Sequence, residues 1–234
     1  MNNPFDFFDE IYCINLEHRP ERWKQAQREF DKVGITDRVK RFDAIYDKEN
    51  PKRGCYESHM GVIRLAHERK LKNVLIFEDD VAFLDCFSEQ KFSKSIETLK
   101  TKEWGFFYIG GLEKRIFPRK EYRSLKELGL AEYDEEFDYL MKCFAVGWAH
   151  SFAVNSSIFA KIAEDYEDDV WSELVRMFDS HLDRYYSEVF PHRHSQTETY
   201  VCVPSFTSQY NVESDLTKSR MNKSLRVQPP TEGG

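Results

Sequence analysis

Cysteine is scarce in this 234-residue sequence, and none of its five cysteines stands in a C-x-x-C pair. Because they are scattered and odd in number, they argue against a disulfide framework or a zinc ribbon. No apolar run approaches the roughly 18 residues that a transmembrane segment needs. The first ten residues contain neither a basic nor an apolar stretch, which disfavours a signal peptide. We therefore expect a soluble cytoplasmic protein, either free or peripheral to a membrane.

Positive charge is also in short supply, since 34 Lys and Arg residues stand against 41 Asp and Glu residues. The net charge of -7 disfavours nucleic acid as a partner, because non-specific nucleic-acid binding needs a basic surface. A small anionic ligand remains compatible, because a few local basic side chains are enough to hold a phosphate. Aromatic residues make up 15% of the chain and are sufficient for a sizeable core.

Strand-like and helix-like segments alternate along most of the chain. The run NVLIFE is apolar almost throughout, as expected for a strand buried on both faces. The alternation predicts an α/β fold with a mostly parallel sheet covered by helices on both sides. We expect one domain over residues 1–215 and a polar, mobile tail over 216–234. Expected strands are 10–16, 39–45, 73–78, 104–111, two within 137–155, and 198–204; expected helices are 19–34, 56–70, 87–101, 156–168 and 172–190, with a loop or small subdomain over 112–136.

Three consecutive acids, Glu78, Asp79 and Asp80, end the third predicted strand and run straight into another apolar stretch. Burying unpaired carboxylates costs several kcal/mol by rough estimate. Ligands of open α/β sheets bind beyond the carboxyl ends of the strands. A divalent cation there would make adjacent carboxylates tolerable, and oxygen ligands suit Mg²⁺ or Mn²⁺ bridging nucleotide phosphates. The plain alternative, an acidic loop or helix cap, is disfavoured by the apolar flanks on both sides.

Basic and polar residues follow other predicted strands. Arg19 and Arg22 share one face near a helix N-terminus, which suits a diphosphate, although salt bridges to neighbouring glutamates are the simpler interpretation. Ser58 and His59 are predicted to open a helix, where amides, hydroxyl and imidazole would hold a sugar or phosphate. A purely structural histidine is the alternative for His59.

The predicted helix 172–190 carries Asp179 and His181 on opposite borders of its apolar stripe. Either residue would serve as a base or a metal ligand if it faced a cleft. The alternative is an ordinary polar helix flank.

Taken in order, these segments resemble glycosyltransferase family 25, which includes bacterial lipooligosaccharide galactosyltransferases and collagen hydroxylysine galactosyltransferases. The resemblance spans roughly residues 10–215 and is most specific over 54–81. YCINLEHRPERW resembles the family's Ile-Asn-Leu-x-x-Arg-x-x-Arg opening, and GCYESHMG with NVLIFEDDV resembles its Gly-Cys-x-x-Ser-His segment and Glu-Asp-Asp strand end. FDSHL and VPSFTSQYNVESDL are similar to its aspartate-x-x-Leu element and its closing segment. WAHS at 148–151 departs from the expected glycine-led, aliphatic strand.

The resemblance implies a GT-A-like, Rossmann-type mixed sheet and an enzyme that transfers a hexose with inversion. The donor would be a UDP-sugar carrying galactose or glucose, the acceptor a hydroxyl of a glycan or glycosylated partner, and the cofactor Mn²⁺ or Mg²⁺. His181 is a further metal candidate. It is chosen for its position on the predicted helix and not from the resemblance, because the family does not require a histidine there. The implied roles are donor binding by Asn15, Arg19, Arg22, Ser58, His59 and Asp79; metal binding by Asp79 and Asp80; substrate contacts by Gln209, Ser214 and Asp215; and base catalysis by Asp179, with Glu78 the weaker candidate.

Two other function classes fit the same kind of sheet. A nucleotidyltransferase usually has a Gly-rich phosphate loop after the first strand, where LEHR at 16–19 has no glycine. A non-catalytic sugar-binding or scaffolding member of the family would keep the sheet and lose the acidic triplet, which is intact here.

Overall fold

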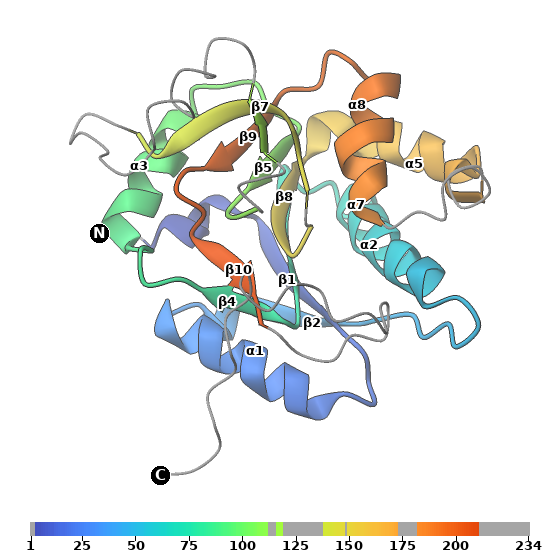
Figure 1. The fold of residues 1–234 in the computed structure, drawn as a ribbon, viewed down its shortest axis with the longest axis horizontal. Coiled ribbons are helices and arrows are strands. Elements are labelled where there is room, and N and C mark those ends of the chain that lie inside the picture. The colour runs from blue at the N-terminus through green and yellow to red at the C-terminus, as the bar shows by residue number, and fades with distance from the viewer. Residues whose placement is uncertain (1–2, 112–115, 119–137, 148, 173–181, 211–234) are drawn as a thin grey trace.

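The computed structural model describes residues 3–111, 116–118, 138–147, 149–172 and 182–210. Its centre is an eight-stranded sheet with the order β2-β1-β3-β8-β5-β9-β7-β6 (Figure 1). The predicted domain boundary at 215 lies outside the described residues. The strands are β1 (Glu10–Asn15), β2 (Val39–Asp43), β3 (Asn73–Glu78), β5 (Phe106–Tyr108), β6 (Ile116–Pro118), β7 (Leu140–Val146), β8 (Ser151–Asn155) and β9 (Thr199–Cys202).

The sheet is mixed, with most strands running in one direction. β1 pairs in parallel with β2 and β3, and β5 pairs in parallel with β9. β8 is antiparallel to β3 and β5, and β7 is antiparallel to β9 and β6. Only β7 and β8 therefore oppose the others, and the carboxyl ends of β1 and β3 meet at one edge.

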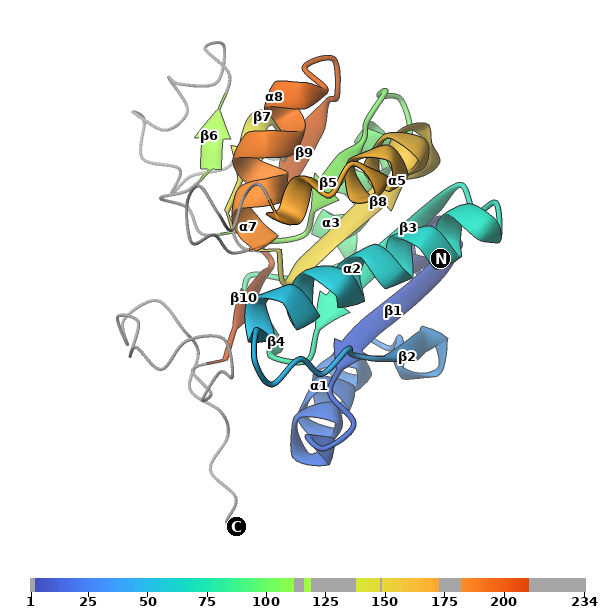
Figure 2. The ribbon, with the colours of Figure 1, turned by 90° about the vertical axis from the view of Figure 1, so that its right-hand side faces the viewer.

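Helices cover both faces of this sheet, because alternate side chains of each central strand are apolar. In β1, Tyr12 and Ile14 join the core on one face, whereas Ile11 and Cys13 join the core on the other. Figure 2 shows α2, α5 and α8 together on one side. The predicted α/β architecture, a mixed and mostly parallel sheet with helices on both faces, is confirmed. The first face carries α2 (Pro51–Glu68), α5 (Phe159–Glu167), α7 (Leu182–Arg184), the π-helical turn η6 (Tyr185–Val189) and α8 (Phe190–Arg193); the second carries η1 (Pro4–Phe7), α1 (Pro20–Lys32) and α3 (Glu89–Leu99).

Helix α2 begins five residues before its predicted start at 56. The Asn50 side chain accepts a 3.2 Å hydrogen bond from the backbone N–H of Arg53, and Pro51 occupies the first helical turn. Ser58 and His59 consequently lie well inside the helix. The prediction that they stand among the exposed amides of a helix N-terminus is wrong.

A short antiparallel ribbon crosses the carboxyl edge of the sheet. It joins β4 (Val81–Phe83) to β10 (Thr207–Gln209), with Val81 opposite Gln209 (Figure 1). The backbone N–H of Tyr210 also donates to the carbonyl of Asp80 at 2.7 Å. The ribbon therefore brings a late segment of the chain against the acidic triplet.

None of the helices in the described ranges combines the length and the apolar character needed to cross a membrane.

Candidate active site

The acidic triplet lies where the sequence predicts, at the carboxyl end of β3. Glu78 is the last residue of the strand, and Asp79 and Asp80 form the turn into β4. Both aspartates are nearly buried, with 8% and 7% of their surface exposed. Two buried carboxylates this close require compensation by neighbouring charge or hydrogen bonds.

An arginine and an asparagine supply that compensation. Nη2 of Arg22, from α1, lies 2.5 Å from Oδ1 of Asp79 and 3.3 Å from Oδ2 of Asp80. Nδ2 of Asn15, at the end of β1, donates to Oδ2 of Asp79 at 2.7 Å, and its Oδ1 accepts from Nε of Arg41 at 2.9 Å. The structure thus brings together Asn15, Arg22 and Asp79, three residues predicted to form the donor site.

Burial raises the pKa of Asp79 from 3.8 to about 6. The negative charges of Asp80 and Glu78 act in the same direction, whereas the Arg22 guanidinium and the Asn15 hydrogen bond lower the pKa. Desolvation outweighs the ion pair, so this carboxyl changes its charge close to neutral pH.

Glu78 and Asp80 converge on a single donor. Nε2 of Gln209 lies 3.2 Å from Oε2 of Glu78 and 3.3 Å from Oδ1 of Asp80. Two carboxylate oxygens therefore face one point at the edge of the sheet, whereas both oxygens of Asp79 are held by Arg22 and Asn15. Within the described ranges, all three acids together do not form one compact group of metal ligands.

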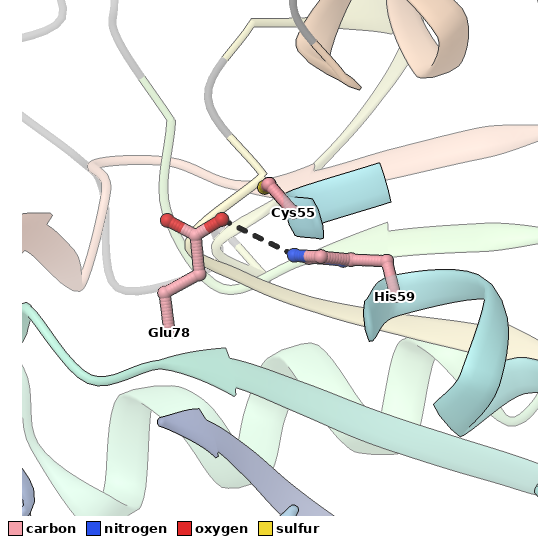
Figure 3. Close-up of side chains that lie close together, drawn as sticks. All are labelled: Cys55, His59 and Glu78. Atoms are coloured by element: carbon pink, nitrogen blue, oxygen red, sulfur yellow. Dashed lines mark hydrogen bonds and ion pairs between the residues drawn. The ribbon is translucent and has the colours of Figure 1, made fainter. Parts of the chain in front are cut away.

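The second oxygen of Glu78 faces helix α2. Oε1 lies 3.2 Å from Nε2 of His59, and Cys55 precedes His59 by four residues on the same face of the helix (Figure 3). One ligand atom from each of these three residues lies within 4.8 Å of the other two. Cys55 has no predicted role, because it lies just before the expected helix 56–70, and the observed start of α2 at Pro51 is what places it one turn before His59.

Two other predicted donor residues, Arg19 and Ser58, make local contacts beside the site. Nε of Arg19 donates to Oε1 of Glu21 at 2.7 Å, so the salt-bridge interpretation fits Arg19, while Arg22 reaches the acidic turn. Oγ of Ser58 donates to the carbonyl of Gly54 at 2.6 Å and accepts from the N–H of Ile45 at 2.8 Å. The predicted Asp179, His181, Ser214 and Asp215 lie outside the described residues.

The unusual WAHS stretch has a structural use. Oγ of Ser151 lies 2.5 Å from Oγ1 of Thr207, and Nε2 of His150 lies 3.3 Å from the same hydroxyl. Both side chains are fully buried. His150 and Ser151 thus fix the start of β10 and, through it, the position of Gln209. The sequence shows that these two residues depart from an aliphatic pattern, but it does not show this role.

The similarity of this chain to solved structures is low in both sequence and backbone. A glycosyltransferase involved in the glycosylation of the major capsid of PBCV-1 is 9% identical, with a TM-score of 0.39 over 83% of this chain and 92% of that one. A197 from STIV is 10% identical, with a TM-score of 0.47 over 96% of both chains.

Sequence comparisons agree on one family. The model described as Glycosyltransferase family 25 (LPS biosynthesis protein) matches residues 50–138. A Glycosyltransferase 25 family member of Drosophila melanogaster is 25% identical over 212 residues, which cover 79% of this chain and 33% of the relative. Procollagen galactosyltransferase 1-A of Xenopus laevis is 26% identical over 156 residues, covering 54% of this chain and 25% of the relative.

A human relative named Inactive glycosyltransferase 25 family member 3 is 27% identical over 143 residues, covering 49% of this chain and 23% of that protein. The chain spans a third or less of the length of these three curated relatives. The chain is therefore similar to glycosyltransferase family 25, over residues 50–138 for the family model and over 79% and 54% of its length for the Drosophila and Xenopus relatives.

Proposed function

We propose that the protein is a metal-dependent, inverting glycosyltransferase that moves a hexose from a UDP-sugar to a hydroxyl of a glycan or glycosylated acceptor. The similarity to the family model supports glycosyl transfer, and the name of the Xenopus relative supports galactose as the sugar, with glucose the alternative. The observation that carries metal dependence is the convergence of Glu78 and Asp80 oxygens on one point at the carboxyl edge of the sheet.

The residues at this point fit a hard divalent cation. Oε2 of Glu78 and Oδ1 of Asp80 both accept from the Gln209 amide there, at 3.2 Å and 3.3 Å. Turning the Gln209 amide by 180° would present its oxygen as a third ligand. Mn²⁺ and Mg²⁺ prefer such oxygen ligands. The proposal therefore assigns the metal to Glu78, Asp80 and Gln209.

Asp79 then has a different role from the one predicted. Because Arg22 and Asn15 occupy both of its oxygens, Asp79 positions the turn and the arginine beside the metal ligands. Arg22 places a positive charge at the edge where the diphosphate of the donor would lie, which suits the predicted role of Arg22 in donor binding. His181 stays a candidate ligand outside the described residues.

The transfer itself needs one attacking hydroxyl and one base. The acceptor oxygen attacks the anomeric carbon opposite UDP, the bond from that carbon to the diphosphate oxygen breaks, and the hydroxyl proton passes to a carboxylate. The cation, when bound, would offset the negative charge of the leaving diphosphate. With Glu78 assigned to the metal, the proposed base is Asp179, on the family resemblance.

Thermal shift with nucleotides tests the donor and metal assignments together. UDP should stabilise the protein when Mn²⁺ is present and not when it is absent, while GDP and CDP should have little effect. Asp80→Asn and Glu78→Gln should lose the response. Asp85→Asn, at an exposed acid shortly after the triplet, is the matched control and should keep it. Stabilisation by UDP that needs no metal, or no response to any nucleotide, would overturn the proposal.

A second function, nucleotide-sugar or glycan binding without transfer, is favoured by the relative whose name calls it inactive. Release of UDP from a panel of UDP-sugars with glycan acceptors separates the two. Binding of UDP with Mn²⁺ but no turnover would support the second function. Asp179→Asn should abolish turnover and keep UDP binding; loss of Mn²⁺-dependent UDP binding instead would make Asp179 a ligand.

A further inference from the structure

We propose that Cys55, His59 and Glu78 form a second cation site, selective for ions that prefer thiolate and imidazole ligands, of which Zn²⁺ is the type. Within the described ranges, this cluster brings one sulfur, one nitrogen and one oxygen ligand atom within 4.8 Å of one another (Figure 3). The site does not rest on the proposed glycosyl transfer, although it shares Glu78 with the cation assigned above.

The separation of two of the ligand atoms already suits one ion. Bonds of 2.0–2.1 Å to a tetrahedral zinc place its nitrogen and oxygen ligands about 3.3 Å apart. Nε2 of His59 lies 3.2 Å from Oε1 of Glu78. A sulfur ligand bonded at 2.3 Å would lie about 3.6 Å from the nitrogen. The Cys55 sulfur lies within 4.8 Å of it, so a displacement of at most about 1 Å would bring the sulfur to that distance.

The scaffold holds these side chains on rigid elements. Cys55 and His59 stand one turn apart on α2, and Glu78 ends a central strand of the sheet that α2 covers. The His59 ring is 1% exposed and stacks on Phe152, with ring centroids 5.7 Å apart and an interplanar angle of 8°. Such packing fixes the direction of the imidazole before any ion arrives, which favours binding.

The chemistry of the ligands selects the class of ion. Thiolate and imidazole favour zinc and similar transition metals, whereas Mg²⁺ and Mn²⁺ prefer carboxylate, carbonyl and water oxygens. Three protein ligands leave a fourth tetrahedral position for water or an oxygen of a substrate. Binding converts the Cys55 thiol to the thiolate and releases its proton, so affinity should rise with pH. The plainer interpretation is a His59–Glu78 ion pair with Cys55 merely nearby.

Titration of the metal-free protein with Co²⁺, a spectroscopic substitute for zinc, tests the site directly. We expect one equivalent to bind with a thiolate-to-cobalt charge-transfer band, and one equivalent of Zn²⁺ to displace it. Cys55→Ser should abolish the band, and His59→Asn or Glu78→Gln should weaken binding at least tenfold. Cys86→Ser is the matched control, because it removes another partly exposed thiol outside the cluster and should leave the band unchanged.

Circular dichroism of each variant separates loss of the ligand from loss of the fold, and Cys55→Ala provides a second variant should Cys55→Ser not fold. Failure to bind Co²⁺ stoichiometrically, or a band that survives Cys55→Ser, would overturn the proposal. If Mn²⁺-dependent UDP binding is absent while the cobalt band is present, the proposed function fails and this site stands.

Discussion

Asp79 links the chemistry of the acidic turn to the stability of the fold. Its carboxyl is almost fully buried, and its pKa is raised from 3.8 to about 6, chiefly by that burial. The folded protein therefore holds a proton there at pH values where the unfolded chain has released it. The stability that Asp79 contributes is fully present below about pH 4 and is lost as the pH rises through about 6.

Asp79→Asn should remove this pH dependence, because the amide does not titrate. The free energy of unfolding of the wild type, measured relative to the variant, should fall by at most about 3 kcal/mol between pH 4 and pH 7. Urea denaturation at pH 4, 5, 6 and 7 measures the difference. Asp85→Asn controls for the loss of one exposed carboxylate. A difference that grows with pH would mean that the Arg22 ion pair outweighs burial and lowers the pKa.

Arg22→Met should leave two buried carboxylates facing each other without a counter-charge. We expect a loss of about 3 kcal/mol in the free energy of unfolding at pH 7. The loss should shrink at pH 5, where Asp79 is largely protonated. Arg22→Lys keeps the charge without the planar guanidinium and should lose less. Urea denaturation measures all three proteins, and an equal loss at both pH values would contradict the electrostatic origin.

Residue identities were easier to predict than residue contacts. The triplet, Asn15, Arg22 and Gln209 all emerged from motifs, and all lie in one cluster. The sequence predicts that a metal ion compensates the buried acids, whereas in the structure Arg22 supplies positive charge beside them. This contact depends on how α1 packs against the acidic turn, which the sequence alone does not show. The sequence does not indicate a role for Cys55, because the cluster it joins includes Glu78, 23 positions away on another element.

At the scale of elements, α1, β4 and β10 meet at one buried carboxylate. Glu29 of α1 is 1% exposed and accepts from the backbone N–H of Phe83 at 2.9 Å. The hydroxyl of Tyr210, just after β10, donates to the other oxygen of Glu29. The carboxylate therefore ties the ribbon that carries Gln209 to the helix that carries Arg22.

Tyr210→Phe should destabilise the fold by about 1–2 kcal/mol, because it removes one hydrogen bond from a buried charged acceptor. Tyr46→Phe is the matched control, since Tyr46 is 58% exposed, and it should change stability by less than about 0.5 kcal/mol. Thermal denaturation compares the two. Equal shifts in the two variants would show that the contact between Tyr210 and Glu29 adds nothing.

Most elements followed from sequence patterns, and the exceptions have physical reasons. Helix α2 starts before the predicted residue 56 because its first residues lack an apolar periodic pattern, although Asn50 followed by Pro51 is a helix-start signal. Strands β4 and β10 have three residues each and carry no periodic pattern of their own. Their pairing is set by tertiary contacts at the sheet edge, which no local window of sequence contains.

At the scale of the whole molecule, the late segment that carries β10 packs directly on the centre of the sheet. The N–H of Phe206 donates to the carbonyl of Ile109 at 3.0 Å. A Cβ added to Gly110 would lie 2.3 Å from the carbonyl oxygen of Thr207 and 2.9 Å from its nitrogen. Only glycine permits this approach, and the position of Gln209 depends on it.

Gly110→Ala should therefore cost about 3 kcal/mol, because the obstruction is backbone and cannot rotate away. Gly61→Ala is the control: its Cβ would meet the Phe42 ring at 2.8 Å, and that side chain is able to shift. Urea denaturation should show the larger loss at Gly110, and Mn²⁺-dependent UDP binding should weaken only there. A similar loss in the free energy of unfolding for both variants would contradict a special requirement for glycine at position 110.

Gln209 lies 131 positions after Glu78, and this interval has a consequence during protein synthesis. A ribosome releases the acidic turn long before it makes the amide that bridges Glu78 and Asp80. A nascent chain can pair its first three strands, yet Gln209 cannot contact Glu78 and Asp80 until β10 has emerged. If the proposed function holds, the nucleotide-sugar donor can engage the nascent chain only after residue 209 has emerged, so it cannot guide the folding of the earlier strands.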